Sequence, residues 1–402
     1  MTLCLFEDDT VARLAPLVLT RAVYDLPPGV LTNRDRAERL FEPDQIAVHV
    51  RESILGMELE ANPQFLRLGG VTGEVLFVNG RWRVSPRVAH QVREGMSSEP
   101  RAWTQGNDLL ALWLPAPPED LADPLSFPEG TEQIQVNGET VISRLWHLLD
   151  DVPERIAEDL RAIGGLGEHR GEVQTGAILA HPGRIHIGKG ATVRPGAVLN
   201  AEDGPIWIGS DAIVEENAVV RGPVYVGERA VIKAGARVDG SSIGYRSKVG
   251  GEIHASIVHS LSNKGHDGYL GNSYLGQWCN LGADTNTSNL RNDYGEVSLW
   301  DPVEQDFVGT GSQFIGLVMG DHSKCAIDTT FNTGTVVGVS CNLYGAGFHS
   351  RHVPSFTWGT PDKQVEYRPE KALRVAEAVM ARRQRSLTDA VRENLLQIHA
   401  GR

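Results

Sequence analysis

The second half of the chain carries a six-residue rhythm of apolar and small positions. The blocks IGKGAT and VRPGAV begin at Ile187, five further blocks from IGSDAI to IKAGAR begin at Ile208, and LGNSY, LGQWCN and LGADTN begin at Leu270. An aliphatic residue opens each block, and a small residue usually stands near the fifth position. This period fits neither a 3.6-residue helical repeat nor a two-residue strand alternation. It predicts a parallel β-helix built from hexapeptides.

Elementary geometry explains the rhythm. Each hexapeptide makes one short strand and one turn, and three of them close a triangular coil of roughly eighteen residues, stacked at a spacing of about 4.8 Å. The aliphatic residue points inward and stacks on its equivalents in neighbouring coils, while glycine tolerates the backbone angles of the corners. One coil cannot bury its own apolar row, so many coils must stack. The excursion at residues 287–307 interrupts the repeat, and such insertions leave a solenoid on one face.

The first part of the chain has the pattern of an α/β domain. Apolar runs at residues 3–8 and 108–115 predict buried strands, and residues 74–85 predict a strand, an Asn-Gly turn and a second strand. Residues 115–138 are rich in Pro, Asp and Glu, which predicts a linker or loop.

Helical spacing marks two further stretches. One covers residues 140–163, where Pro153 starts a second segment, and the other covers residues 370–399, with a break near Arg385–Ser386. Ser386 followed by Asp389 resembles a helix-capping start. The predicted organisation is therefore an α/β domain at 1–138, a helical connector at 139–171, a β-helix at 172–345, and an exit loop with C-terminal helices at 346–402.

Composition narrows the classes of function. The formal net charge of −13 over 402 residues argues against nucleic acid as a partner. The four cysteines (Cys4, Cys279, Cys325, Cys341) form no CxxC pair, which argues against a disulfide framework or a structural zinc site. Because no signal segment and no membrane-length apolar run is present, we expect a cytoplasmic protein that does not bind membranes.

Polar residues cluster where the repeat becomes irregular. Lys264, His266, Asp267, Tyr269, Asn280 and Asn289 lie within a short span. A histidine at a turn is suited to accept a proton near neutral pH, which N-acetylation of an ammonium group requires. The alternative is that His266 is a solvated turn residue without a catalytic role.

These residues carry a resemblance to the GlmU-like family of bifunctional sugar nucleotidyltransferases and acetyltransferases, in an alternate bacterial branch. The family's HLxYLGD, NxGAG and CNYDG motifs are matched by His266–Gly271, Asn280–Ala283 and Ser288–Asn289, while Leu290 and Asp284 depart from the pattern. The resemblance implies a left-handed β-helix that N-acetylates glucosamine 1-phosphate with acetyl-CoA. It makes His266 the base, and it implies substrate contacts for Lys264, Tyr269, Asn280 and Asn289.

The same resemblance extends to both ends of this region. Residues 314–328 and 332–345 look like the later coils that bind acetyl-CoA, with Lys324 beside the cofactor; a role for Lys324 in a mere surface turn is the alternative. At the N-terminus, the frame LAPL…TRAxxDL resembles the branch's nucleotidyltransferase opening, although the glycine-rich loop GxGTRM is absent.

The N-terminal frame supplies candidate nucleotide-binding residues. Arg21 and Arg36 are natural phosphate partners, and Asp8, Asp9 or Asp25 could hold Mg²⁺ through water for uridylyl transfer from UTP. An internal ion pair between Arg21 and Asp25 is the alternative. By resemblance we also expect a homotrimer acting on amino-sugar phosphate and nucleotide substrates.

Three rival functions remain open. The N-terminal domain can be a degenerate, non-catalytic remnant beside an active acyltransferase. Alternatively, the β-helix can be a trimerisation or regulatory platform for a nucleotidyltransferase. A purely structural or surface-binding solenoid needs a flat, regular Thr face, which this sequence lacks.

Overall fold

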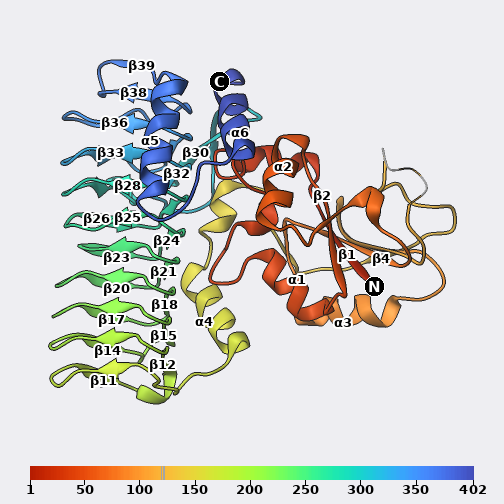
Figure 1. Ribbon diagram of the computed structural model, residues 1–402, viewed down its shortest axis with the longest axis horizontal. Coiled ribbons are helices and arrows are strands. Elements are labelled where there is room, and N and C mark those ends of the chain that lie inside the picture. Colours follow the sequence, from red (N-terminus) through yellow and green to blue (C-terminus); the bar gives the residue numbers. More distant parts are fainter. Residues whose placement is uncertain (119, 121–122) are drawn as a thin grey trace. The chain divides into compact units, whose positions relative to one another are not determined.

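The computed structural model shows two compact units and describes residues 1–118, 120 and 123–402 (Figure 1). The first unit holds residues 1–14, 18–27 and 31–144, and the second holds residues 15–17, 28–30 and 145–402. Residues 119, 121 and 122, in the middle of the predicted linker, lie outside the described residues. The predicted domain boundaries at 138, 171 and 345 stay predictions.

The first unit is built on a sheet of seven described strands in the order β3-β2-β1-β4-β7-β6-β8. The strands from β3 to β4 run parallel, and β7 is antiparallel to both of its neighbours. The strands are β1 (Thr2–Phe6), β2 (Gln45–His49), β3 (Leu66–Arg67), β4 (Val75–Asn79), β6 (Arg101–Gln105), β7 (Asp108–Leu114) and β8 (Glu132–Gln135). The helices are α1 (Asn33–Phe41), α2 (Glu52–Ala61) and α3 (Pro86–Gly95), with short 3₁₀ helices at η1 (Asp9–Leu14), η2 (Val23–Asp25) and η3 (Leu68–Gly70).

Strands β1 and β4 lie side by side in the inner part of the sheet and are buried along their whole length. Every residue of each is buried, so both faces of the sheet are covered there. After β1 the chain builds β2 and β3 on one side and then crosses to β4 on the other. The carboxyl ends of β1 and β4 therefore meet at a topological switch point, where open α/β sheets bind ligands. Asp8 follows β1 and Asn79 ends β4 at this edge.

Several local predictions for this part of the chain need correction. The two strands flanking the Asn-Gly turn exist, but they belong to different sheets, because β5 (Trp82–Arg83) pairs with β9 (Thr140–Val141). The linker prediction was wrong at residues 132–135, which form β8 beside β6. The helical prediction was wrong at 140–141, where β9 forms. At Leu145–Leu148 the structure has only a short 3₁₀ helix, η4. Helix α4 (Val152–Ile163) confirms the segment that contains Pro153.

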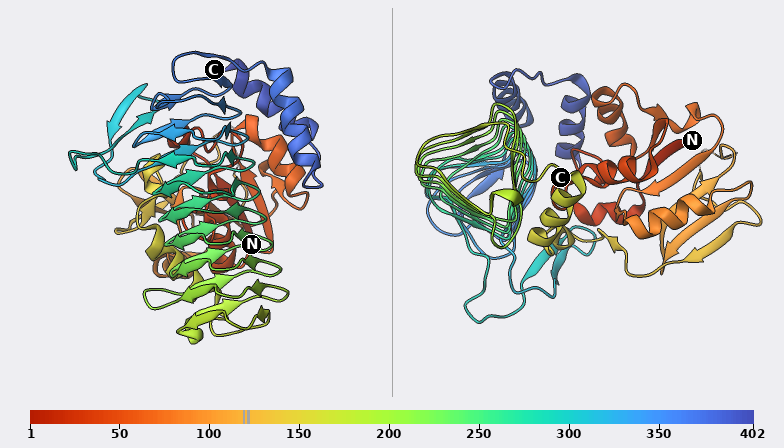
Figure 2. Two further views of the ribbon diagram at one scale, coloured as in Figure 1. Left: turned by 90° about the vertical axis from the view of Figure 1, so that its left-hand side faces the viewer. Right: turned by 90° about the horizontal axis from the view of Figure 1, so that it is seen from below.

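The second unit is dominated by stacked coils (Figure 2) whose strands form three parallel sheets. One sheet contains β10 (Glu172–Val173), β13 (Thr192–Val193), β16 (Ile213–Val214), β19 (Val231–Ile232), β22 (Lys248–Val249), β25 (Asn263–Lys264), β28 (Asn280–Leu281), β33 (Lys324–Cys325), β36 (Asn342–Leu343), β38 (Thr357–Gly359) and the antiparallel β39 (Gln364–Glu366). We call it the long sheet.

The other two sheets complete the coils. The middle sheet contains β12 (Ile185–Ile187), β15 (Ile206–Ile208), β18 (Val224–Val226), β21 (Ser242–Ile243), β24 (Ile257–Val258), β27 (Tyr274–Leu275), β32 (Leu317–Met319), β35 (Thr335–Val337) and β37 (His352–Val353). The short sheet contains β11 (Ile178–Ala180), β14 (Val198–Asn200), β17 (Val219–Arg221), β20 (Arg237–Asp239), β23 (Glu252–His254) and β26 (Tyr269–Gly271). A single 3₁₀ turn, η5 (Pro182–Arg184), precedes β12.

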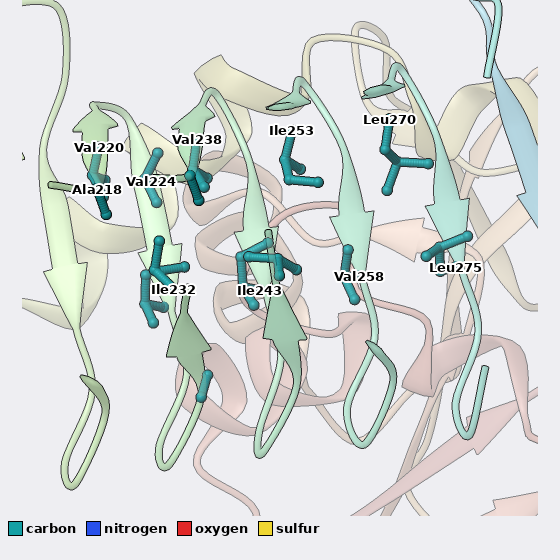
Figure 3. Packing of buried hydrophobic residues seen from close by; sticks show 14 of the residues in the cluster. Ala218, Val220, Val224, Ile232, Val238, Ile243, Ile253, Val258, Leu270 and Leu275 are labelled. Atoms are coloured by element: carbon teal, nitrogen blue, oxygen red, sulfur yellow. The ribbon is translucent and has the colours of Figure 1, made fainter. Parts of the chain in front are cut away.

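The core of the coils is the apolar row predicted from the repeat. Figure 3 shows Val220, Val238, Ile253 and Leu270 in successive coils, all fully or almost fully buried. The stacking follows from register, because each of these residues is the parallel partner of the next. The hydrophobic effect therefore acts along the whole stack rather than within one coil.

The repeat is interrupted where the sequence predicted an excursion. Residues 298–309 form an antiparallel hairpin of β30 (Ser298–Asp301) and β31 (Asp306–Gly309), and β29 (Asn286–Thr287) pairs with β34 (Thr330–Phe331). Parallel pairing continues through β37 and β38 beyond residue 345.

The C-terminal helices α5 (Pro369–Ala381) and α6 (Asp389–Ala400) confirm the predicted helical pattern and its break. The predicted cap is wrong by two residues, because the side chain of Thr388, not Ser386, accepts the hydrogen bond from the Val391 amide. The α/β domain, the parallel β-helix and the C-terminal helices confirm the architecture expected from the sequence. In the described part of the chain, no helix is long and apolar enough to cross a membrane.

Candidate functional site

His266 lies at a corner of the coil, on the turn between β25 and β26. Its side chain and that of Asp267 are exposed. They border a groove of about 280 Å³ whose other lining residues are small, apart from Asp284: Ala234, Gly250, Gly251, Gly265 and Ala283. A Cβ atom at Gly251 would come within 2.4 Å of the Gly268 carbonyl oxygen, so this stacked corner requires glycine. The arrangement leaves the imidazole open to a ligand.

Lys264 holds this turn from inside the coil. It is fully buried at an inward position, as the parallel partner of Val249 in the coil below. Its ammonium group donates to the carbonyl oxygens of His266 at 2.8 Å and Asp267 at 2.6 Å. Burial lowers the pKa of Lys264 to about 8, against the raising effect of the nearby Asp267 charge. The structure thus brings Lys264 and His266 together through the backbone of the turn.

Tyr269 and Asn289 form a second group beside the short sheet. The Asn289 side-chain amide donates to the Tyr269 hydroxyl at 3.0 Å and to the Asn272 side-chain oxygen at 2.7 Å. A Cβ atom at Gly271 would lie 2.3 Å from the Tyr269 hydroxyl oxygen, so glycine there makes room for the pair. Burial raises the pKa of Tyr269, while the hydrogen bond from Asn289 lowers it. Two polar groups that can contact a sugar are therefore fixed relative to each other.

Asn280 and Lys324 lie side by side on the long sheet. They are direct partners in the pairing of β28 with β33, and Asn342 follows in β36. Asn280 is exposed, whereas the Lys324 ammonium group donates to the His322 carbonyl oxygen at 2.8 Å. Burial lowers the pKa of Lys324 to about 8. Among the described residues, no hydrogen bond joins this pair to the His266 ring or to Tyr269.

The N-terminal candidates are part of a buried charged cluster in the first unit. Arg21 and Arg36 are only 7% and 8% exposed. The carboxylate of Asp25 lies 2.7 Å from Nε of Arg34, a residue that the sequence analysis did not single out. Burial, and then the charge of Glu58, raise the pKa of Asp25 to about 7, while Arg34 and Arg21 oppose this shift. Asp25 thus has Arg34 as a cationic partner, and the charge of Arg21 acts on it as well.

Asp8 is engaged in a similar way at the switch point of the sheet. Arg81 donates from Nε to one Asp8 oxygen at 2.8 Å and from Nη2 to the other at 2.6 Å, and it also contacts Asp108 at 2.5 Å. The side-chain amide of Asn79 donates to Asp8 at 2.8 Å. Burial alone would raise the pKa of Asp8, but Arg81 outweighs it and the pKa is lowered.

These ion pairs decide how the candidate Mg²⁺ ligands fit. Both oxygens of Asp8 already accept hydrogen bonds, and Asp25 faces Arg34. Within residues 1–118, 120 and 123–402, no group of three or more His, Cys, Asp or Glu side chains is arranged to hold a metal ion. Mg²⁺ usually takes only one or two carboxylates and completes its shell with water and substrate phosphates, and Asp9, the third candidate, is exposed. Asp9 is therefore the carboxylate that would hold an Mg²⁺ ion brought by the nucleotide.

Sequence reasoning missed Arg81 and Arg34 for an identifiable reason. Arg81 follows the Asn-Gly turn, which was used only as a turn signal, and its partners lie 73 and 27 residues away in the chain. Arg34 lies in the LTNRDR stretch at the start of α1, from which sequence reasoning chose Arg36 instead. The ion pairs that Arg81 and Arg34 make with aspartates form only in the folded chain.

Comparisons with known proteins divide along the same two parts of the chain. Residues 3–165 match the model of a sugar nucleotidyl transferase family, and residues 205–240 match the bacterial transferase hexapeptide model of six repeats. Together with the described helices and sheets, these matches confirm the predicted fold class: a nucleotidyltransferase-like α/β domain, a parallel β-helix of hexapeptide repeats and C-terminal helices. The left hand of the β-helix stays a prediction.

Curated relatives match over shorter segments. The bifunctional protein GlmU of Methanocaldococcus jannaschii is 32% identical over 107 residues, which is 27% of this chain and 26% of that protein. A bifunctional sugar-1-phosphate nucleotidylyltransferase/acetyltransferase of Sulfurisphaera tokodaii is 28% identical over 110 residues, 27% of each chain. The GlmU protein of Methanococcus vannielii is 35% identical over 98 residues, 24% of this chain and 22% of that protein. The chain thus spans about a quarter of the length of these relatives.

Solved structures include similar chains, although the overall superpositions are poor. A UDP-N-acetylglucosamine acyltransferase gives a TM-score of 0.20 at 10% identity, covering 56% of this chain and 84% of that one. The acyltransferase of Campylobacter jejuni gives 0.18 at 11% identity, covering 57% and 94%. Scores this low carry no argument. The resemblance to GlmU-like sugar nucleotidyltransferases and acetyltransferases is therefore confirmed by the family models and the curated relatives, over the segments that match.

Proposed function

We propose that this chain is a GlmU-like sugar-phosphate transferase. Its β-helix would transfer the acetyl group of acetyl-CoA to the amine of glucosamine 1-phosphate or a similar amino-sugar phosphate. Its N-terminal domain would then transfer a uridylyl group from UTP, giving UDP-N-acetylglucosamine. The observation that carries the proposal is the corner at His266, an exposed imidazole beside an open groove on a turn held by the buried Lys264.

The chemistry needs no covalent intermediate on the protein. His266 takes a proton from the sugar ammonium, and the free amine attacks the thioester carbonyl carbon. The tetrahedral intermediate collapses with cleavage of the carbon–sulfur bond, and the departing thiolate takes up a proton to leave as coenzyme A. Tyr269 and Asn289, already joined by a hydrogen bond, can orient the sugar hydroxyls.

The coils around this site suggest where the acyl donor and the other subunits belong. Lys324 lies on the long sheet, in a coil after that of His266, as the resemblance requires for a residue near acetyl-CoA. We propose a homotrimer with one acetyltransferase site per subunit, as expected from the resemblance to the GlmU-like enzymes.

A second candidate function has a specific observation in its favour. Asp8 and Asp25, two of the carboxylates considered for the nucleotide site, are engaged by Arg81 and Arg34. A domain with its acidic groups tied up in internal ion pairs suits a non-catalytic remnant. The alternative is therefore an acyltransferase whose N-terminal domain has lost uridylyl transfer.

Product assays separate the two functions. Purified full-length protein is incubated with glucosamine 1-phosphate and acetyl-CoA, and thiol release is measured; UTP and Mg²⁺ are then added, and pyrophosphate is measured. His266→Ala should lower the rate of thiol release by at least about 100-fold, as expected for loss of a general base. Pyrophosphate release from N-acetylglucosamine 1-phosphate should be unchanged.

The matched control is His169→Ala, which removes an exposed histidine at the start of the coils. This variant should acetylate at the wild-type rate. If His266→Ala retains wild-type thiol release, His266 is not the base. If wild-type protein releases thiol but no pyrophosphate, the N-terminal domain is the remnant of the second candidate.

A further inference from the structure

Arg351 is a half-buried cation that no carboxylate accompanies. Its Nε donates to the Thr333 carbonyl oxygen at 3.1 Å, and its Nη2 donates to the Ser298 hydroxyl at 2.9 Å and to the Ser298 carbonyl oxygen. These acceptors are all neutral. Among the described residues, no Asp or Glu forms an ion pair with Arg351, and its Nη1 group makes none of the hydrogen bonds. Buried charges are normally paired, which makes a half-buried guanidinium without an anionic partner a candidate binding group for an anion.

A pocket of about 160 Å³ lies beside this guanidinium. Its lining consists of Arg291, Val297, Ser298, Asn332, Thr333 and Arg351. The second arginine is close enough to act on the first: burial, and then the charge of Arg291, lower the pKa of Arg351. Arg291 is itself paired with Asp293, to which it donates from Nε at 2.9 Å and from Nη2 at 2.6 Å, so Arg351 is the guanidinium of the two that, in the described part of the chain, has no carboxylate beside it. Arginine, hydroxyl and amide donors together are the set that binds phosphate.

The fold keeps this pocket open and its walls fixed. A Cβ atom at Gly334, whose φ is +67°, would come within 2.6 Å of the Ser298 carbonyl oxygen and 3.2 Å of Nη2 of Arg351. The Arg351 guanidinium lies over the Phe307 ring at 4.5 Å, which ties the β30–β31 hairpin to the last coils. Glycine at 334 and the stacked hairpin therefore define the cavity.

The pocket is also connected to the candidate substrate residues. The hydroxyls of Ser288 and Thr333 are 2.8 Å apart, and Ser288 precedes Asn289. The Ile315 amide donates to the Asn289 carbonyl oxygen, and the Gly334 amide donates to the Ile315 carbonyl oxygen, each at 3.0 Å. The pocket wall is thus linked to Asn289, which contacts Tyr269, by two backbone hydrogen bonds through Ile315 and by the contact between Thr333 and the neighbouring Ser288.

We propose that Arg291 and Arg351 form a binding pocket for the phosphate group of a phosphate ester, completed by Ser298, Asn332 and Thr333. The pocket stands on its own geometry, whereas its assignment to a substrate of acetyl transfer rests on the proposed function. The phosphate can belong to the amino-sugar phosphate or to the 3′-phosphate of coenzyme A, and the experiment distinguishes these sources.

Calorimetric titration of the full-length chain tests the pocket. The probes are glucosamine 1-phosphate against glucosamine, and coenzyme A against its 3′-dephospho form. Arg351→Met should weaken binding of one phosphorylated probe at least tenfold, and Arg291→Met at least threefold, while the matching unphosphorylated probe binds as before. The control Arg170→Met, at an exposed arginine paired with Glu168, should bind every probe like the wild type.

The outcomes separate the pocket from the catalytic proposal. Unchanged affinity of Arg351→Met and Arg291→Met for all phosphorylated probes overturns the pocket. Because Arg351 also supports the hairpin, Arg351→Met can lose its fold; Arg291, an exposed residue, then decides alone. If the protein never acetylates glucosamine 1-phosphate, yet both variants lose phosphate binding, the pocket stands and the proposed function fails.

Discussion

The lower and upper coils of the β-helix solve the same packing problem in different ways. At the buried small position of the long sheet, the lower coils have Ala191, Ala212 and Ala230, whose amides donate to the carbonyl oxygen three residues back. The upper coils have Ser247, Ser262 and Cys279 there instead, followed by Ser323 and Cys341.

The hydroxyl groups change how neighbouring coils are joined. The Ser262 amide donates to the Ser247 hydroxyl at 3.1 Å, and the Cys279 amide donates to the Ser262 hydroxyl at 2.9 Å. The Cys341 amide repeats this contact with Ser323 at 2.9 Å. Directional bonds hold coils in one register, whereas apolar stacking is non-directional. The candidate active-site corner lies where side-chain hydrogen bonds add to the backbone ladder that joins all the coils, whereas the lower coils have only the ladder and apolar stacking at this position.

The largest effect is expected when the buried lysine of the upper coils is replaced. In Lys264→Met, the lost hydrogen bonds to the His266 and Asp267 carbonyls are offset by removal of a buried charge, so the free energy of unfolding should change by less than about 2 kcal/mol. The loosened turn should lower kcat for acetylation by roughly 100-fold, the cost of misplacing a catalytic group by about 1 Å. KM should stay within about threefold.

The matched control uses the same inward row one coil below. Val249→Met should cost about 1–3 kcal/mol through overpacking and leave kcat near the wild-type value. Steady-state kinetics and urea unfolding of both variants provide the measurements. Equal losses of kcat in the two variants would show that Lys264 acts only through stability.

A smaller effect is expected for the serine that joins two upper coils. Ser262→Ala leaves the Cys279 amide without its buried acceptor and the Gly276 carbonyl oxygen without its donor at 2.6 Å. The free energy of unfolding should fall by about 1–3 kcal/mol. Urea denaturation checks this against Ser210→Ala, an exposed lower-coil serine whose loss should cost at most about 0.5 kcal/mol. Equal values would remove the distinction between the coils.

The final test concerns pH dependence. The pKa of Lys264 is about 8 in the folded chain and near the ordinary 10.5 when unfolded, so between these values the unfolded chain binds more protons. Stability from this group is therefore lowest below about pH 8 and rises with pH toward 10.5. The difference in unfolding free energy between wild type and Lys264→Met should shift in favour of the wild type from pH 8 to pH 10. A pH-independent difference would contradict a shifted lysine.

The predictions that succeeded rest on local pattern. The hexapeptide rhythm depends on residues a few positions apart, and the buried strands β1, β4 and β7 are continuous apolar runs. The predictions that failed depend on distant partners. Glu132–Gln135 is a strand only because β6 offers it an edge, and Thr140–Val141 is a strand only because β5 lies opposite. Propensity in such short segments is overridden by tertiary pairing.

The candidate site divides in the same way. A motif placed His266, Tyr269, Asn280 and Asn289 near one another in sequence, but it did not show that Lys264 points inward or that Asn280 lies beside Lys324 on another face. The pairing of Asp25 with Arg34 was likewise not readable from spacing. Charges choose partners by distance in space, and those distances are set by the packing of whole elements.

The sequence by itself determined that residues from about 187 onward stack into coils, because a six-residue period can bury its apolar row in no other regular way. It also determined the chemistry available at the corner, since the residue types are given. Only the tertiary structure decided which groups are paired and which are left open. Arg81 meets two carboxylates across the sheet, whereas Arg351, 53 residues from Ser298, meets only neutral oxygens. Burial and long-range contact, not composition, fix the charge that each pocket presents.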